Sequence, residues 1–146
     1  MTATVLIIGR VGRLRDGLCT ILRTFPGIMQ VRAVDGFESA FEQLAFEFSS
    51  VVIVDGDERL ENACPSLKRM FSTYTETRYI VIANTLRQRA MTQELGADAV
   101  LLRGFSTSAL YGTLVSLAII PDSGYIGGQP GMNPSPTTAV LTLQKP

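Results

Sequence analysis

Asp55 lies at the end of a predicted strand. In proteins that alternate strands and helices, functional residues are common at this place. Asp55 closes a short apolar run at residues 51–54 that is rich in β-branched side chains, a composition that favours a buried strand. A carboxylate in this place can serve a functional site at the end of the strand, or it can simply cap the turn that follows. Asp55 is therefore the first candidate for a functional residue, with both interpretations open.

Three arginines form a second group of candidates. Arg10, Arg13 and Arg15 cluster at the start of a predicted helix, where the helix macrodipole disfavours positive charge. The simpler interpretation is that all three are solvated side chains. The alternative is a site for an anion or for an acidic partner.

Other sources of chemistry are weak or excluded. Gly9-x-x-Gly12, with Gly17, has some similarity to a nucleotide-binding loop, but it lacks the Gly-x-Gly-x-x-Gly spacing and a P-loop lysine. The chain contains no histidine, which excludes histidine triads, histidine bases and histidine metal ligands. Cys19 and Cys64 form no metal-binding pattern, and we expect free thiols in a reducing cytoplasm rather than a disulfide.

Composition limits the classes of function. The 146 residues are 46% hydrophobic and 18% charged, and 13 basic residues balance 13 acidic ones. A net charge of zero argues against a broad nucleic-acid surface, so we expect no direct nucleic-acid binding. No apolar run reaches the roughly 18 residues of a membrane span, and the N-terminus lacks the features of a signal peptide. We therefore expect a cytoplasmic protein that does not enter membranes.

Hydrophobic periodicity predicts strands and helices in strict alternation. Short apolar runs predict five strands, at residues 4–8, 29–33, 51–54, 79–83 and 99–102. Helical spacing of apolar residues predicts five helices, marked by Leu14, Leu18, Leu22 and Phe25; by Phe37, Phe41, Leu44 and Phe48; by Leu60, Cys64, Leu67 and Phe71; by residues 86–95; and by Leu110, Leu114 and Leu117. Gly96 and Ser106 are well placed to cap the fourth and fifth helices. The phenylalanines of the second helix are expected in the core.

Five βα units in order predict an α/β fold with a doubly wound parallel sheet. We expect the flavodoxin-like (βα)₅ arrangement with strand order 2-1-3-4-5, and one domain over residues 1–120. Residues 121–146 hold five of the seven prolines, four glycines and only two charges, which predicts a tail or linker. Within it, Tyr125-Ile126 and residues 139–143 are apolar enough to pack on the domain or to pair with a sheet edge, of this chain or of a neighbour.

Over residues 4–120 the chain resembles response-regulator receiver domains, and most of all the NarL/FixJ-type class that usually carries a helix-turn-helix output domain. Four features carry the resemblance in register: Arg15-Asp16-Gly17-Leu18, Asp35-Gly36, Asp55, and Gly96-Ala97-Asp98. The resemblance implies that Asp55 corresponds to the phosphoacceptor, Arg103 to the lysine that contacts the phosphoryl group, and Ala83 to the small hydroxyl residue after the fourth strand.

The same resemblance implies that the phosphorylation chemistry is lost. Two acids that bind magnesium in the family correspond to Gly9 and Arg10. The aromatic switch residue corresponds to Val100, and the proline after the lysine corresponds to Gly104. Magnesium prefers a near-octahedral set of oxygen ligands. Asp55 alone is a poor site for the ion, and Arg10 would place a positive charge where the metal belongs. We therefore expect no metal, no cofactor and no catalytic residue, and we do not expect an enzyme.

Taken together, the sequence indicates a degenerate, phosphorylation-independent receiver, a protein-interaction module in bacterial signalling or transcription regulation. Two alternatives stay open: a small-ligand or nucleotide-binding flavodoxin-like protein, and a response regulator truncated before its DNA-binding domain. We further expect Asp55, Arg10 and Arg103 to converge at one sheet edge, with at least one arginine paired to Asp55. The expected partners are a signalling protein and, weakly, a second copy of the chain.

Overall fold

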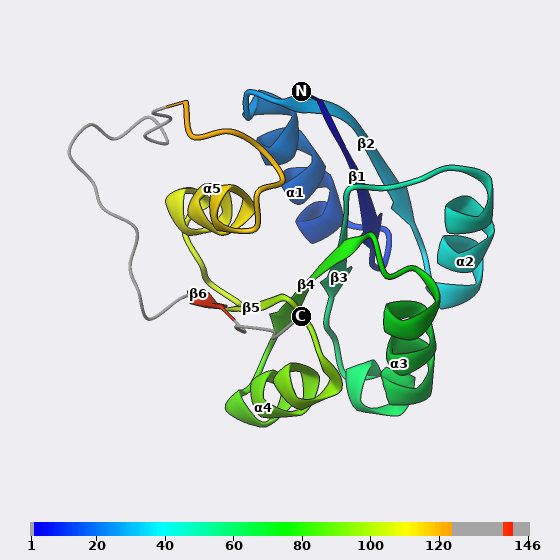
Figure 1. The fold of residues 1–146 in the computed structure, drawn as a ribbon. Helices are drawn as coiled ribbons and strands as arrows, with labels where there is room; N and C mark the ends of the chain where they lie inside the picture. Colours follow the sequence, from blue (N-terminus) through cyan, green and yellow to red (C-terminus); the bar gives the residue numbers. More distant parts are fainter. Residues whose placement is uncertain (1, 124–138, 142–146) are drawn as a thin grey trace.

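The computed structural model describes residues 2–123 and 139–141, and they form one sheet with helices on both faces (Figure 1). The strands are β1 (Ala3–Ile8), β2 (Ile28–Val34), β3 (Val51–Asp55), β4 (Arg78–Ala83), β5 (Ala99–Leu102) and β6 (Ala139–Leu141). The helices are α1 (Arg13–Thr24), α2 (Phe37–Phe46), a short 3₁₀ helix η1 (Leu60–Ala63), α3 (Cys64–Thr73), α4 (Leu86–Leu95) and α5 (Thr107–Ser116).

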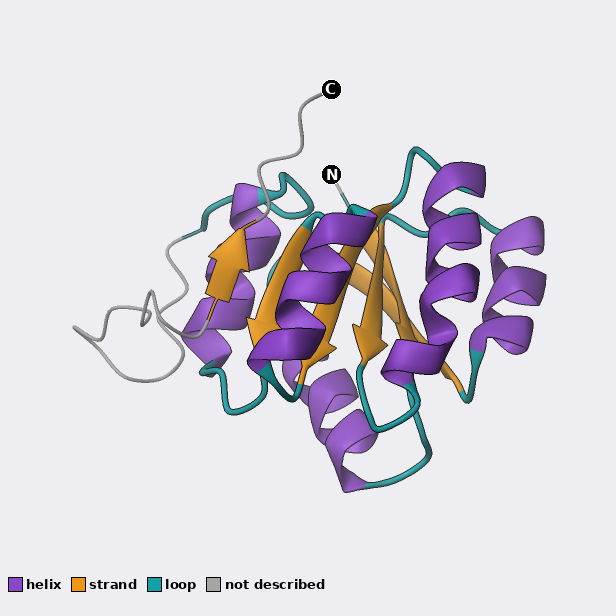
Figure 2. Ribbon diagram, turned by 90° about the horizontal axis from the view of Figure 1, so that it is seen from below, coloured by secondary structure: helices purple, strands orange, loops and turns teal. Residues whose placement is uncertain are grey.

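The sheet has the order β2-β1-β3-β4-β5-β6. All pairs among β1 to β5 are parallel, so the predicted order 2-1-3-4-5 is confirmed. Figure 2 shows the strands lying side by side, with helices on both sides of the sheet. The carboxyl ends of the parallel strands meet at one edge of the sheet, and this edge receives Asp55 from β3 and Arg103 from the end of β5. The topology therefore brings together residues that are 48 positions apart in the sequence.

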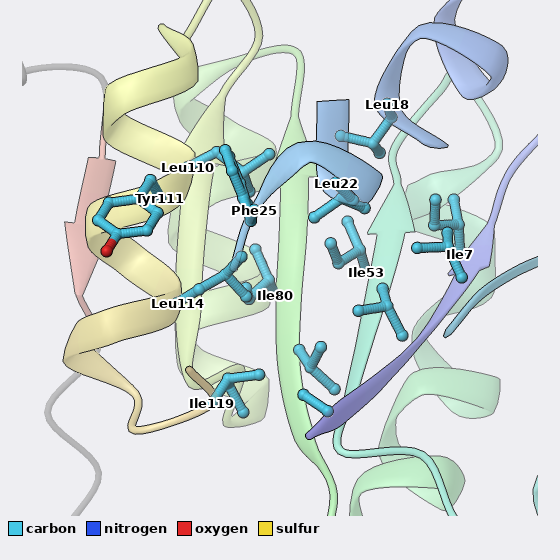
Figure 3. Packing of buried hydrophobic residues seen from close by; sticks show 14 of the residues in the cluster. Ile7, Leu18, Leu22, Phe25, Ile53, Ile80, Leu110, Tyr111, Leu114 and Ile119 are labelled. Carbon is cyan, nitrogen blue, oxygen red and sulfur yellow. The ribbon is translucent and has the colours of Figure 1, made fainter. Parts of the chain in front are cut away.

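Alternation along each strand divides the core into two layers. Val5 and Ile7 of β1 belong to the layer that α1 and α5 cover, and Leu6 and Ile8 belong to the layer that α2 and α3 cover. Figure 3 shows the first layer, in which helix residues pack on strand residues such as Ile53. Strands buried on both faces need continuous apolar sequence, which explains the apolar runs that predicted them.

Capping residues fix the boundaries of α4 and α5, and the sequence predicts two of them, Gly96 and Ser106. The Thr85 side chain accepts a hydrogen bond from the backbone N–H of Gln88 at the start of α4, and Gly96 ends that helix with φ of 112°. Ser106 caps α5 by accepting from the N–H of Ala109, as the sequence predicts. Pro65 lies in the first turn of α3, where its missing N–H costs nothing.

One core prediction is wrong. Leu44 is buried and Phe37 and Phe41 are half-buried, but Phe48 is 60% exposed. The reason is that α2 ends at Phe46 and the backbone turns extended at Glu47, so Phe48 does not lie on the helix face that Phe37 begins. Phe46 itself is 93% exposed.

The chain after α5 continues against the domain as far as the structure describes it. Ile119 and Ile120 are buried, and the hydroxyl of Tyr111 accepts a hydrogen bond from the N–H of Ser123 at 2.8 Å. Of the apolar tail segment 139–143, residues 139–141 form β6, which pairs antiparallel with β5, so the expected pairing with a sheet edge is confirmed for them. Tyr125-Ile126 and residues 142–143 lie outside the described residues.

Both cysteines are free thiols, as expected; Cys19 is buried and Cys64 is half-buried. No helix in the described part of the chain is both long enough and apolar enough to cross a membrane.

Candidate functional site

An ion pair between Asp55 and Arg103 lies at the centre of the sheet edge. Asp55 is the last residue of β3, and Arg103 follows β5, where its backbone N–H donates to the carbonyl oxygen of Ala83 at 2.8 Å. Nη2 of Arg103 lies 2.5 Å from Oδ1 of Asp55. The Asp55 side chain is only 12% exposed and that of Arg103 is 32% exposed. A carboxylate so well buried needs a partner, and the guanidinium supplies it.

The same guanidinium makes two further contacts. Nη2 of Arg103 donates to the carbonyl oxygen of Gly56 at 2.6 Å, and Nε donates to the side-chain oxygen of Asn84. The Asn84 side chain in turn donates through Nδ2 to the Gly56 carbonyl oxygen at 3.2 Å. Arg103 therefore ties the ends of β3, β4 and β5 to one another through a carboxylate, a carbonyl and an amide.

Gly56 is required by the close approach of the loop to β4. Its N–H donates to the carbonyl oxygen of Ile82 at 2.8 Å. A Cβ added to Gly56 would lie 2.3 Å from that oxygen and 2.8 Å from Cδ2 of Leu60, closer than atoms can pack. Only glycine lets the chain turn here and present its carbonyl oxygen to Arg103.

Gln88 holds the two loops from the other side. This α4 residue is only 5% exposed. Its Oε1 accepts from the backbone N–H of Asn84 at 2.8 Å, and its Nε2 donates to the carbonyl oxygen of Asp57 at 3.0 Å. A buried amide that satisfies both its donor and its acceptor fixes the geometry of what it connects, and here it connects the loop after β3 to the loop after β4.

Arg10 lies at the same sheet edge but binds different carboxylates. Its Nε is 3.2 Å from Oδ2 of Asp57, and its Nη2 is 2.8 Å from Oε2 of Glu58. Asp57 also pairs with Arg59 at 3.0 Å. The expected pairing of an arginine with Asp55 is therefore present, but Arg103 alone makes it among the ion pairs of the described residues.

The pKa of Asp57 reflects these arginines. Burial raises the pKa of its carboxyl, but hydrogen bonds from Arg59 and the charges of Arg59 and Arg10 outweigh burial, and the pKa lies below its ordinary value of 3.8. At neutral pH Asp57 is therefore ionised, and Arg10 and Arg59 both bind its carboxylate.

Arg15 is neither solvated nor available to an anion. Its side chain is 16% exposed, and its Nη1 lies 2.9 Å from Oδ1 of Asp35 and donates to the carbonyl oxygen of Gly9 at 3.2 Å. The interpretation of Arg10, Arg13 and Arg15 as three solvated side chains is wrong for Arg15, whereas Arg10 and Arg13 are exposed. Arg15 instead links α1 to the ends of β1 and β2.

Two openings flank Asp55. One, of about 410 Å³, lies between the start of α2 and η1, and its lining includes Asp35, Phe37, Asp55, Arg59 and Leu60. The other, of about 300 Å³, lies beside the start of α1, and Arg10, Asp55 and Arg103 all line it. The predicted convergence of these three residues at one sheet edge is thereby confirmed.

The residues present do not fit the magnesium site that receiver domains carry. Oδ1 of Asp55 and the carbonyl oxygen of Gly56 both accept hydrogen bonds from Arg103, so neither is open to a metal ion. Gly9 supplies no ligand, and a Cβ there would already be 3.0 Å from Cβ of Asp55. Within residues 2–123 and 139–141, no group of three or more His, Cys, Asp or Glu side chains is arranged to hold a metal ion.

Sequence reasoning placed Asp55, Gly9, Arg10, Ala83 and Arg103 at this edge, and the structure brings all five to it. It missed the roles of Gly56, Asn84 and Gln88. Gly56 directly after Asp55 was a usable signal, since a glycine that follows a strand often marks a close backbone approach. Gln88 could not be predicted in the same way, because a glutamine in a largely polar helix is usually an exposed residue.

Comparisons with known proteins rest on structure, because no family model and no curated protein sequence matches the chain. The isolated REC domain of RcsB from Salmonella enterica serovar Typhimurium, with the phosphomimetic BeF3⁻, is similar with a TM-score of 0.69 and 15% identity, over 81% of this chain and 89% of that one. A LuxR-family DNA-binding response regulator from Silicibacter pomeroyi is similar with a TM-score of 0.67 and 21% identity, over 82% and 92%.

A longer RcsB response regulator from Salmonella typhimurium is similar with a TM-score of 0.69 and 15% identity, over 80% of this chain. The likeness spans only 59% of that protein's length. At these identities the comparisons bear on architecture rather than on activity. They show that the chain has the receiver-domain fold.

Proposed function

We propose that the chain is a receiver-like protein-interaction module of bacterial signalling that works without phosphorylation. The observation that carries the proposal is the set of contacts of Arg103 with Asp55, Gly56 and Asn84. In a phosphorylated receiver, a metal and a cation stabilise charge at this edge. Here a single guanidinium supplies positive charge to the acceptor carboxylate and the neighbouring carbonyl permanently.

The contacts of Arg103 also restrict how the protein could change shape during signalling. A switch needs two states of similar free energy that an input can bias. The Arg103 contacts and the Gln88 bridge tie three loops together in the absence of any input, which favours one arrangement of the surface around β4 and β5. A partner would then recognise a constant surface, and regulation would come from the abundance or location of either protein.

Localisation follows the same proposal. Free cysteines are typical of a reducing compartment. The free thiols Cys19 and Cys64 support a cytoplasmic protein.

The test is a comparison of partner capture from the native host. The wild-type chain and the Asp55→Asn variant serve as baits, each with and without a small phosphodonor and magnesium. The proposal predicts the same captured protein in all four samples, because the surface does not depend on the charge state of Asp55. A partner captured only after phosphodonor treatment of the wild-type chain would contradict it.

A second candidate, a small-ligand-binding protein, is favoured by the opening of about 410 Å³ beside Asp55. This volume falls in the range of pockets that hold small molecules, and apolar Phe37 and Leu60 line it together with Asp35 and Arg59. Native mass spectrometry of the protein purified from its host tests this function. A stoichiometric adduct that disappears on denaturation would support it, and an unadducted mass would count against it.

A further inference from the structure

The opening of about 410 Å³ beside Asp55 is lined by apolar side chains from four elements. They are Ile8 of β1, Phe37 of α2, Val54 of β3 and Leu60 of η1. Ile8, Val54 and Leu60 are each at most 3% exposed, whereas Phe37 is half-buried. α2 and η1 cover the same face of the sheet (Figure 1). Such a lining suits a compact apolar body held by a few polar contacts.

One oxygen of Asp55 faces this opening without a hydrogen bond. Oδ1 accepts from Arg103, but no hydrogen bond among the described residues reaches Oδ2. Gly9 lines the opening, and a Cβ added to it would lie 3.4 Å from Oδ2. The absence of a side chain at Gly9 therefore leaves Oδ2 within reach of a molecule in the opening. Because the carboxylate is only 12% exposed, an N–H donor there would satisfy an acceptor that water reaches poorly.

The charges around the opening favour a neutral donor over a cation. Three carboxylates line it, and each forms an ion pair with arginine: Asp35 with Arg15, Asp55 with Arg103, and Asp57 with Arg10 and Arg59. A cationic ligand would lose its hydration and gain little from carboxylates that arginine already neutralises. A neutral N–H donor makes a strong hydrogen bond to a charged acceptor without that cost.

We propose that the opening binds a neutral, planar heteroaromatic molecule that carries an N–H donor. The ring lies between Phe37 and Leu60, and its N–H donates to Oδ2 of Asp55. Phe37 can pack against such a ring in an offset-stacked or edge-to-face arrangement. This ligand class rests on the small-ligand-binding function proposed above, and the protein-interaction function does not depend on it.

Three small molecules test these requirements separately on the full-length chain. Benzimidazole is planar, neutral at mildly basic pH and carries an N–H. Its derivative 1-methylbenzimidazole has the same ring without the donor, and benzamidine is planar and cationic. Heteronuclear NMR follows the backbone amides of Gly9, Gly36 and Phe37, which line the opening, during each titration. A fragment of this size is expected to bind with a dissociation constant of about 1 mM.

Two glycine variants test the location and supply its control. Gly36 lines the opening, its φ of −165° is extended backbone, and nothing lies within 4 Å of an added Cβ. Gly36→Leu therefore adds a side chain beside the opening without a backbone clash. Gly17 has the same space around an added Cβ but is not part of the lining, so Gly17→Leu is the matched control. Far-UV circular dichroism checks that both variants are folded.

Benzimidazole is expected to shift the amides around the opening, and 1-methylbenzimidazole to bind about tenfold more weakly, because it cannot donate to Oδ2 of Asp55. Benzamidine should bind no more tightly than benzimidazole. Gly36→Leu should weaken benzimidazole binding about tenfold, because its side chain competes for the same space. Gly17→Leu should leave the affinity within about twofold.

The contrary outcomes separate the ligand class from the function on which it rests. Equal binding of benzimidazole and its methyl derivative, or tighter binding of benzamidine, overturns the ligand class while small-ligand binding stands. An unchanged affinity in folded Gly36→Leu overturns the location. Amides around the opening that do not shift with any of the three molecules overturn the ligand class and count against small-ligand binding as well.

Discussion

Nη2 of Arg103 lies 2.5 Å from Oδ1 of Asp55 and 2.6 Å from the carbonyl oxygen of Gly56. A guanidinium thus binds one carboxylate oxygen and one carbonyl oxygen at this edge of the sheet. The arrangement gives a carboxylate that is only 12% exposed a cationic partner.

Removing Arg103 should destabilise the fold, because it leaves the Asp55 carboxylate without its partner. Arg103→Met leaves the Asp55 carboxylate nearly buried and without its cation, so we expect a loss of about 1–3 kcal/mol in the free energy of unfolding at neutral pH. Asp55→Asn in the Arg103→Met background should recover part of that loss, because it removes the unpaired charge. Denaturant unfolding of both single variants and the double variant measures the coupling.

The matched control for this cycle is Arg87→Met. Arg87 is 84% exposed and pairs with Glu61 at 3.5 Å on the surface, so its removal should change stability by no more than about 0.5 kcal/mol. Equal changes in the free energy of unfolding for the Arg87 and Arg103 substitutions would show that the Asp55–Arg103 pair stabilises the fold no more than a surface ion pair.

Gly56 and Gly17 should respond in opposite directions to the same substitution. Gly56→Ala places a Cβ 2.3 Å from the Ile82 carbonyl oxygen, so the β3–β4 connection must move, and we expect a loss of at least about 2 kcal/mol. Gly17 is an exposed residue of α1 with nothing within 4 Å of an added Cβ. Gly17→Ala should stabilise by up to about 1 kcal/mol. Thermal unfolding of the two variants under the same conditions distinguishes them.

Gln88 should be intolerant of a substitution that the same helix accepts elsewhere. Gln88→Leu removes the donor to the Asp57 carbonyl and the acceptor of the Asn84 N–H, and these partners stay partly buried. We expect a loss of about 1–3 kcal/mol. Gln93→Leu, at a half-buried position of α4, is the control and should cost less than about 0.5 kcal/mol. Hydrogen exchange of the Asn84 amide should accelerate only in the first variant.

Two carboxylates should give opposite pH dependences. Burial raises the pKa of Asp98, despite the hydrogen bond from the Tyr79 N–H and the charge of Arg78. The folded chain therefore binds this proton more tightly than the unfolded chain, and stability is lost as pH rises from the ordinary value of 3.8 through the raised one. The pKa of Asp57 is lowered, so its contribution is present above the ordinary value and is lost as pH falls through the lowered one.

Unfolding free energies between about pH 3 and pH 7 test these signs. Relative to the wild-type chain, Asp98→Asn should become more favourable as the pH rises, because it keeps an acceptor for Tyr79 without a buried charge. Asp57→Asn should become less favourable over the same interval. Parallel profiles for the two variants would contradict the assignment.

The architecture could be predicted from the sequence because each signal for it is local. Apolar runs define the strands, and Ser106 and Gly96 cap helices with their own side chain or backbone. Phe48 shows where local periodicity fails. It keeps the helical spacing of Phe37 and Phe41, but α2 has already ended at Phe46, and nothing in the spacing itself reveals that end.

The site was predictable only to the level of topology. Parallel strands bring Asp55 and two arginines to one edge, so an arginine–Asp55 pair could be expected. Which arginine makes it depends on the path of the loops: Arg10 is drawn to Asp57 and Glu58, whereas Arg103 is held by the Ala83 carbonyl in reach of Asp55. Such choices between competing carboxylates are settled by distances of a few ångströms that residue types do not encode.

We propose that Arg103 takes the place of a metal ion and closes Asp55 to phosphorylation. The most direct measurement is the intact mass of the wild-type chain after incubation with a small phosphodonor and magnesium, with peptide mapping of any product. We expect no adduct, because Oδ1 of Asp55 and the carbonyl oxygen of Gly56 already accept hydrogen bonds from Arg103 and Gly9 has no side chain to bind a metal. A gain of one phosphoryl group on Asp55 that depends on magnesium would contradict it.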